Sequence, residues 1–138
     1  MPYIVSTWNG KEVAERASKL ADRAPFEIGL AIQGQAKLLS PYETGRLRAS
    51  ITTASGDGRR TNPSGVGANP NDKIEAPTES NETFVGTPVS YGPYMEYGTI
   101  HTSAQPFLRP ALDIVRGKTL QIVQAQAKKE FGDYLDPK

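Results

Sequence analysis

The segment YGPYMEYGTIHTSAQPFLRPAL, residues 91–112, joins a tyrosine-rich turn to the start of a helix. Its tyrosines, Tyr91, Tyr94 and Tyr97, recur at intervals of three, so a short helical turn would stack their rings on one side. Gly98 follows and can adopt the left-handed conformation that ends a helical turn. We therefore expect this segment to brace the fold.

Two prolines define the second half of the segment. Pro106 and Pro110 stand near the start of a long amphipathic helix predicted over residues 105–135, because the first turn of a helix tolerates proline. Phe107 lies between them and supplies an apolar anchor for the core. The roles of these residues specify a fold, and none of them is chemically reactive.

Glu96 is the acidic residue among the tyrosines, and a semi-buried carboxylate there needs a partner. Arg46, Arg48 or Arg109 could supply one, and Arg109 is placed to reach Glu96 from the helix start. We predict a structural ion pair rather than a catalytic carboxylate.

Another long helix is predicted in the N-terminal third of the chain. Apolar residues recur at helical spacing from Lys11 to Leu39, with charged residues on the opposite face. Pro25 lacks the N–H of an interior helical residue, so we predict a kink or break there. Before this helix, the apolar patch Tyr3-Ile4-Val5 suits a strand or an arm.

A small antiparallel sheet is predicted between the two helices. Apolar and polar residues alternate over residues 47–52, and residues 82–87 have the composition of a second strand. A helical turn over residues 44–48, beginning at Thr44 and Gly45, is the alternative for the first of these stretches.

The connection between these strands, residues 54–79, is dominated by Gly, Pro, Asn, Asp and Ser. A structureless loop of this length within a compact domain is usually functional or disordered. We predict a flexible hairpin loop that orders on assembly. Its candidate interface residues are Arg59, Arg60, Val66, Lys73 and Ile74.

The chain of 138 residues fits a single domain, residues 1–138, of the α+β class. The sequence contains no cysteine, which excludes disulfides and thiolate chemistry. Sixteen basic and 15 acidic residues give a net charge of +1, without the basic excess typical of nucleic-acid binding. No secretory signal and no stretch of ~20 apolar residues is present, so we expect no membrane association.

No catalytic arrangement stands out in the sequence. The single histidine, His101, lies in a polar loop, and no Gly-x-Ser-x-Gly nucleophile motif is present. Glu75, Glu79 and Glu82 lie in or beside the long loop, where a site is poorly preorganised. We expect neither an enzyme nor a bound metal or cofactor.

Taken together and in this order, the motifs resemble the tailed-bacteriophage family described as head–tail joining, neck or minor tail-component proteins, of the tail completion type. The resemblance covers about residues 11–130. The positions that match the family's pattern are Thr44, Gly45, Leu47, Ser50, Gly86, Tyr91, Tyr94, Glu96, Gly98, Thr99, Pro106, Phe107, Arg109 and Pro110.

The resemblance implies a virion protein at the head–tail junction that is assembled in the host cytoplasm. Such a subunit would form a homo-oligomeric ring, expected to be a hexamer, between connector proteins and the tail tube or tail terminator. DNA would pass through the ring without sequence-specific binding. A ring requires a heterologous interface that closes on itself, and the sequence places that contact in loop 54–79 and on helix faces rather than in residues 91–112.

Two other interpretations remain open. A nucleic-acid-binding or nuclease-like phage accessory protein would use Arg59, Arg60 and the acidic residues near them. A soluble phage adaptor would never form a ring. Salt-dependent DNA binding distinguishes the first of these from a structural subunit.

Overall fold

The computed structural model describes residues 10–43 and 45–135. Its helices and its two-stranded antiparallel sheet confirm the predicted α+β class. In chain order the elements are α1 (Gly10–Leu39), α2 (Arg46–Ser50), β1 (Thr52–Ser55), β2 (Thr83–Gly86), α3 (Gly92–Tyr97), α4 (Leu108–Arg116) and α5 (Thr119–Leu135). The patch Tyr3-Ile4-Val5 and Thr44 lie outside the described residues.

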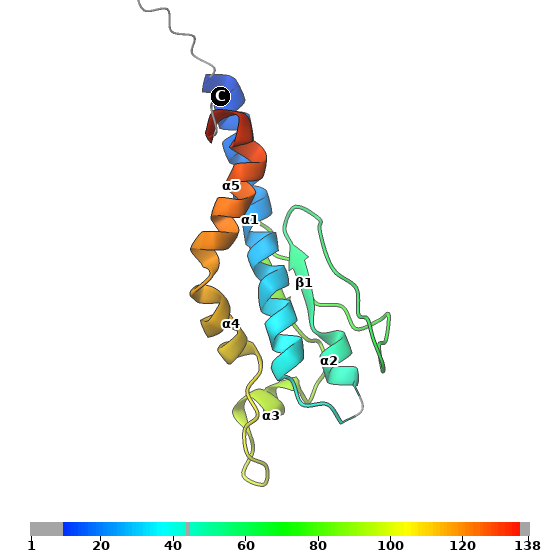
Figure 1. The fold of residues 1–138 in the computed structure, drawn as a ribbon. Coiled ribbons are helices and arrows are strands. Elements are labelled where there is room, and N and C mark those ends of the chain that lie inside the picture. Colours follow the sequence, from blue (N-terminus) through cyan, green and yellow to red (C-terminus); the bar gives the residue numbers. More distant parts are fainter. Residues whose placement is uncertain (1–9, 44, 136–138) are drawn as a thin grey trace, which may run out of the picture.

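The long helix α1 organises the molecule. Helices α4 and α5 return along one side of it, and the sheet lies along another side (Figure 1). The sheet approaches α1 closely at Gly29, where a Cβ atom would lie 2.7 Å from Cγ2 of Thr83 and 2.8 Å from Cγ2 of Thr53. A glycine in the middle of α1 therefore makes room for the sheet.

The hydrophobic core lies where the C-terminal half of α1 meets α2 and the start of α4. Phe107 and Ile51 are its largest fully buried side chains, and burial of each stabilises the fold by about 1.5–3 kcal/mol. The predicted anchoring role of Phe107 is thus confirmed. The buried core members are Ala36, Leu47, Ile51, Val89, Phe107 and Ala111.

Helix α1 is continuous through Pro25, so the expected interruption does not divide it into two helices. Proline removes one hydrogen bond to the carbonyl four residues earlier, here that of Ala21. Ala21 is exposed, so solvent can bind that carbonyl. The helix therefore tolerates Pro25 and remains one element.

The predicted strand over residues 47–52 is wrong in its first part. Residues 46–50 form the short helix α2, two residues later than the helical turn at 44–48 in the alternative interpretation, and β1 begins only at Thr52. Leu47 and Ile51 are both buried, and a spacing of four residues fits one face of a helix as well as one face of a strand. Gly45, with a φ of 81°, precedes the helix.

The helical character predicted for residues 105–135 is confirmed, but the chain forms two helices there, α4 and α5, in place of one. A turn at Gly117 and Lys118 separates them, in which the Lys118 N–H donates to the Val115 carbonyl at 2.8 Å. The Thr119 hydroxyl donates to the same carbonyl at 3.1 Å. Glycine is a poor helix former, and this competing hydroxyl bond favours a new start.

The sheet pairs β1 with β2 in an antiparallel register that sets Thr52 opposite Gly86. Residues 54 and 55 belong to β1, so the long connection begins at residue 56 rather than at residue 54. This connection first returns along β1, where the Thr61 N–H donates to the Thr53 carbonyl at 2.9 Å. The hydroxyls of Thr53 and Thr61 both donate to Oε1 of Gln33 on α1, at 2.7 and 2.8 Å.

Candidate assembly surface

Glu96 on α3 binds the N-terminus of α4. Its carboxylate accepts the backbone N–H groups of Phe107 at 2.8 Å, Leu108 at 3.0 Å and Arg109 at 2.9 Å. A helix start leaves about four N–H groups without an intrahelical partner. Glu96 satisfies three of them, and the next residue, Pro110, has no N–H to satisfy. The Glu96 carboxylate and Pro110 together account for the N–H groups at the start of α4.

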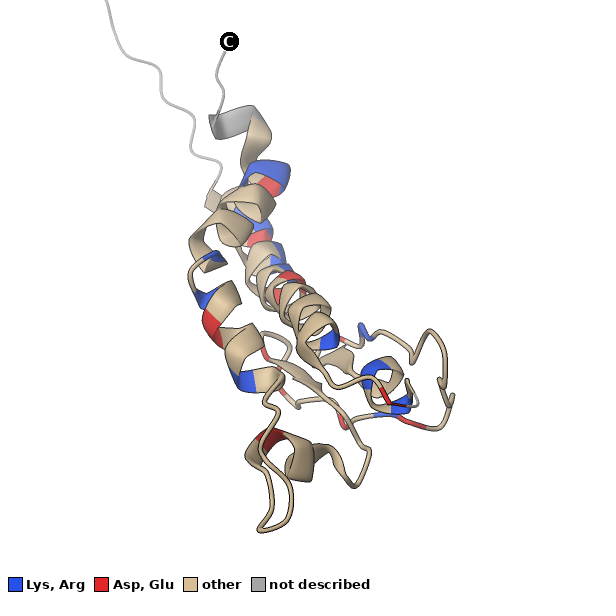
Figure 2. Cartoon of the chain, turned by 60° about the horizontal axis from the view of Figure 1, so that its bottom comes forward, with Lys and Arg blue, Asp and Glu red and all other residues tan. Residues whose placement is uncertain are grey.

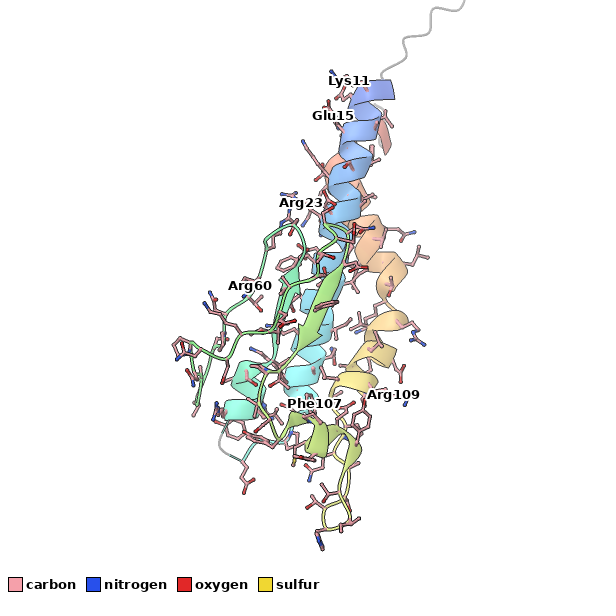
Figure 3. All side chains as sticks on the ribbon, turned by 180° about the vertical axis from the view of Figure 1, so that it is seen from behind. Lys11, Glu15, Arg23, Arg60, Phe107 and Arg109 are labelled. Atoms are coloured by element: carbon pink, nitrogen blue, oxygen red, sulfur yellow. The ribbon has the colours of Figure 1, made fainter. Side chains whose placement is uncertain are left out.

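The predicted Glu96–Arg109 ion pair is therefore corrected to a bond between Glu96 and the Arg109 backbone. The Arg109 side chain is exposed and extends outward from α4 (Figure 3). Burial alone would raise the pKa of the Glu96 carboxyl, but the three N–H groups and the charge of Arg109 outweigh it and lower that pKa. The ionised carboxylate is the form that holds the two helices together.

Replacing Glu96 with glutamine is expected to destabilise the fold by about 1–3 kcal/mol near neutral pH, because the charge-assisted bonds are lost. The folded pKa of Glu96 is lowered, so its stabilisation is present above the ordinary value of about 4.3 and is lost as the pH falls through the folded pKa. Urea unfolding of both proteins should show a difference in unfolding free energy that shrinks in acid. A difference that stays constant from neutral pH to about pH 3 would contradict this role of the carboxylate.

The segment after α3 forms a loop, residues 98–106, that projects from the end of the molecule (Figure 1). The base of the loop is closed by bonds from the Gln105 N–H to the Met95 carbonyl at 2.7 Å and from the Gly98 N–H to the Tyr94 carbonyl at 2.8 Å. The Thr99 hydroxyl accepts the Thr102 N–H at 3.0 Å near the tip. Backbone bonds thus hold the loop in one shape.

Gly98 permits this path, although not in the conformation predicted. Its φ of 77° confirms the need for glycine, but its ψ of 176° places it outside the left-handed helical region. A Cβ at this position would lie 2.8 Å from the Ala104 nitrogen. Glycine is needed at position 98 for two reasons: its backbone angles, and its close contact with the backbone of the loop at Ala104.

Large apolar side chains are exposed on α3 and the loop. Tyr94 is 61% exposed, Tyr97 80% and Ile100 94%, and we call these three residues the α3 surface. Within residues 91–106 Glu96 is the only Asp, Glu, Lys or Arg, whereas acidic and basic residues are interspersed along the helices (Figure 2). An exposed, charge-poor and aromatic surface is typical of a protein interface.

The other residues of the predicted motif lie around this end and are mostly structural. Ser50 is fully buried, and its hydroxyl donates to the Leu47 carbonyl at 2.7 Å and lies 2.6 Å from the Thr87 hydroxyl. Tyr91 is the N-cap residue of α3 and lines a groove with Met95 beside α2. The structure places Gly45 before α2, Gly86 at the end of β2 and Pro106 just before Phe107.

The candidate interface residues of the long connection lie on a different part of the molecule. Arg59 pairs with Asp57 at 3.1 Å, and the Arg60 guanidinium donates to the Ile74 carbonyl at 3.4 Å. Val66 and Lys73 are exposed, and Ile74 is half-buried. The two arginines thus have partners within the connection itself.

Another contact of the connection was missed by sequence reasoning. Arg46 of α2 donates to the buried Asp72 at 3.2 Å, and this hydrogen bond to Asp72 raises the pKa of the guanidinium. Ile100 was also missed, although an apolar residue between Thr99 and His101 was a visible signal. His101 lies exposed beside it.

Among residues 10–43 and 45–135, no group of His, Cys, Asp and Glu side chains is arranged to hold a metal ion. In the same part of the chain no helix is long and apolar enough to cross a bilayer. Searches of family models, curated protein sequences and solved structures found no match to the chain.

Proposed function

We propose that this protein is a non-enzymatic structural subunit of a tailed-phage head–tail junction, of the neck or tail completion type, and that it assembles into a ring through which DNA passes. The observation that carries the proposal is the α3 surface: three large apolar side chains exposed on a segment whose backbone is held at both ends. Holding a surface rigid before it binds lowers the entropy cost of association.

The motif residues also support a structural role. Glu96, Gly98, Phe107 and Pro110 bind, shape or anchor the segment that carries the α3 surface. The same residues underlie the resemblance to phage neck proteins. In this proposal the neighbours are other copies of the chain, expected as a hexamer, with a connector protein on one side and a tail-tube or terminator protein on the other.

The charge distribution suits a subunit that lines or surrounds a DNA channel without binding DNA tightly. The net charge is +1, and positive and negative residues are interspersed along the helices (Figure 2). Strong non-specific DNA binding requires several uncompensated cations that displace counterions. DNA would slide past such a surface.

The double substitution Tyr97→Ser with Ile100→Ser is expected to weaken self-association at least about ten-fold, because it removes most of the apolar area of the α3 surface. Sedimentation velocity over a concentration series measures the strength of self-association. Leu120→Ser is the matched control, since Leu120 is 69% exposed on α5. Both variants should keep the wild-type melting temperature within a few degrees.

A chain that stays monomeric at high concentration and is absent from purified particles of its phage would overturn the proposal. Binding to duplex DNA at micromolar protein that falls steeply with salt would favour the accessory-protein alternative instead.

A further inference from the structure

Among the residues that the structure describes, none pairs with the outer edge of strand β2. The Ser55 N–H and the Thr53 carbonyl bond to the connection on the far side of β1, whereas the Gly56 N–H bonds to the Glu82 carbonyl. Because hydrogen-bonding direction alternates along an antiparallel pair, Thr83 and Val85 direct their backbone groups away from β1. None of the described residues forms a hydrogen bond with the backbone of either residue.

This edge opens into a groove of ≈ 510 Å³. Ile32 of α1 lines it together with Val85, and Leu108 and Leu112 of α4 line its opposite side. Tyr97 of the α3 surface also contributes, and Glu96 and Arg109 add the charged part of the lining. The hydroxyl of Thr83, which lines the groove, is buried and has no hydrogen-bond partner within residues 10–43 and 45–135. An apolar groove beside unpaired strand groups fits an extended peptide that adds a strand to the sheet.

We propose that the occupant is the N-terminal segment Tyr3-Ile4-Val5 of a second copy of this chain. An aromatic and two β-branched residues favour an extended strand, and they match the apolar walls of the groove. Their backbone groups would pair with Thr83 and Val85. Among residues 1–12 these form the only run of three consecutive aromatic or β-branched residues.

The segment cannot reach the groove of its own chain. Thr83 lies beside Gly29, and Gly29 is about 28 Å along α1 from Gly10, at ~1.5 Å per residue. Val5 precedes Gly10 by five residues, which span at most ~18 Å when fully extended. Lys11 and Arg109 accordingly lie toward opposite ends of α1 (Figure 3). The segment must therefore enter the groove of a neighbouring copy.

Such a contact joins two different surfaces of the chain, so it can pass from each subunit to the next as a heterologous interface. Repeated around a closed circle it makes a ring, so this inference rests on the proposed self-assembly and gives it a mechanism. In this proposal the N-terminal segment Tyr3-Ile4-Val5, rather than the long connection between β1 and β2, is the part of the chain that reaches a neighbouring subunit.

Cysteine cross-linking tests the contact, since the natural chain contains no cysteine. Tyr3→Cys, Ile4→Cys and Val5→Cys proteins are each mixed with a Phe84→Cys protein, because Phe84 is 48% exposed on β2. At least one mixture should form a disulfide-linked heterodimer. The matched control, Leu120→Cys mixed with the same arm variants, should form none above background.

Deletion of residues 1–8 should weaken self-association at least about ten-fold without lowering the melting temperature. If the wild-type chain self-associates but no arm variant cross-links to Phe84→Cys, the arm contact is wrong and the proposed assembly stands. Cross-linking of Phe84→Cys to itself alone would instead indicate pairing of two β2 edges and would overturn the arm contact. A wild-type chain that never self-associates overturns the arm contact, and it overturns the proposed function as well if the chain is also absent from purified particles of its phage.

Discussion

Replacing Phe107 with alanine is expected to destabilise the protein by about 3–5 kcal/mol, the largest effect of any side-chain truncation in the core. Phe107 is 0% exposed and belongs to the cluster that joins α1, α2 and α4. Alanine would leave a cavity that the surrounding backbone can fill only in part, since Glu96 fixes the Phe107 N–H. Urea unfolding followed by circular dichroism measures the loss.

The control for this experiment is Tyr97→Ala. Tyr97 is another aromatic residue of the same segment but is 80% exposed, so its truncation should change the unfolding free energy by less than about 0.5 kcal/mol. A loss below about 1 kcal/mol for Phe107→Ala would show that Phe107 does not anchor the core.

Gly98→Ala is expected to destabilise the protein by about 3 kcal/mol or more. Its φ of 77° with a ψ of 176° belongs to a region that only glycine occupies readily, and the backbone strain alone costs about 1–3 kcal/mol. The added Cβ would also lie 2.8 Å from the Ala104 nitrogen and 3.0 Å from the Thr102 carbonyl oxygen. Because both contacts are to backbone, the loop itself must move.

Gly34→Ala is the matched control for Gly98→Ala. Gly34 lies in α1 with no atom within 4 Å of an added Cβ. Alanine there should stabilise the helix by about 0.5–1 kcal/mol. Thermal and urea unfolding measure the change in unfolding free energy for both substitutions. Changes of opposite sign would show that the effect at Gly98 comes from the loop geometry and not from replacing glycine in general. Equal effects would contradict the special role of Gly98.

The tyrosine-rich segment shows how far sequence reasoning extends. Spacing correctly predicts the helical turn at Tyr94 and Tyr97, and residue type correctly predicts that Phe107 is buried. The partner of Glu96 was not predictable in the same way. Arginine side chains are visible in a sequence as candidate partners, whereas the free N–H groups of a helix start become partners only once the chain places that start beside Glu96.

The predicted boundaries of two elements differ from the observed ones for a related reason. Leu47 and Ile51 satisfy the spacing of a helix and of a strand at once, so packing of both side chains into the core decided between the two. The predicted C-terminal helix divides at Gly117, where a turn to the Val115 carbonyl competes with helical continuation. Such competition is settled by small local energies that a periodic pattern does not reveal.

The amino-acid sequence by itself determined the α+β class, the two long helical regions, the absence of thiol chemistry and the balanced charge, because these depend on composition and on local periodicity. Only the tertiary structure decided what Glu96 binds, which aromatic side chains stay exposed and which edge of β2 the described residues leave unpaired. Those features depend on contacts between residues distant in the chain. Residues 91–112 therefore brace the fold, as their pattern predicts, and also carry the α3 surface, which their pattern alone did not assign.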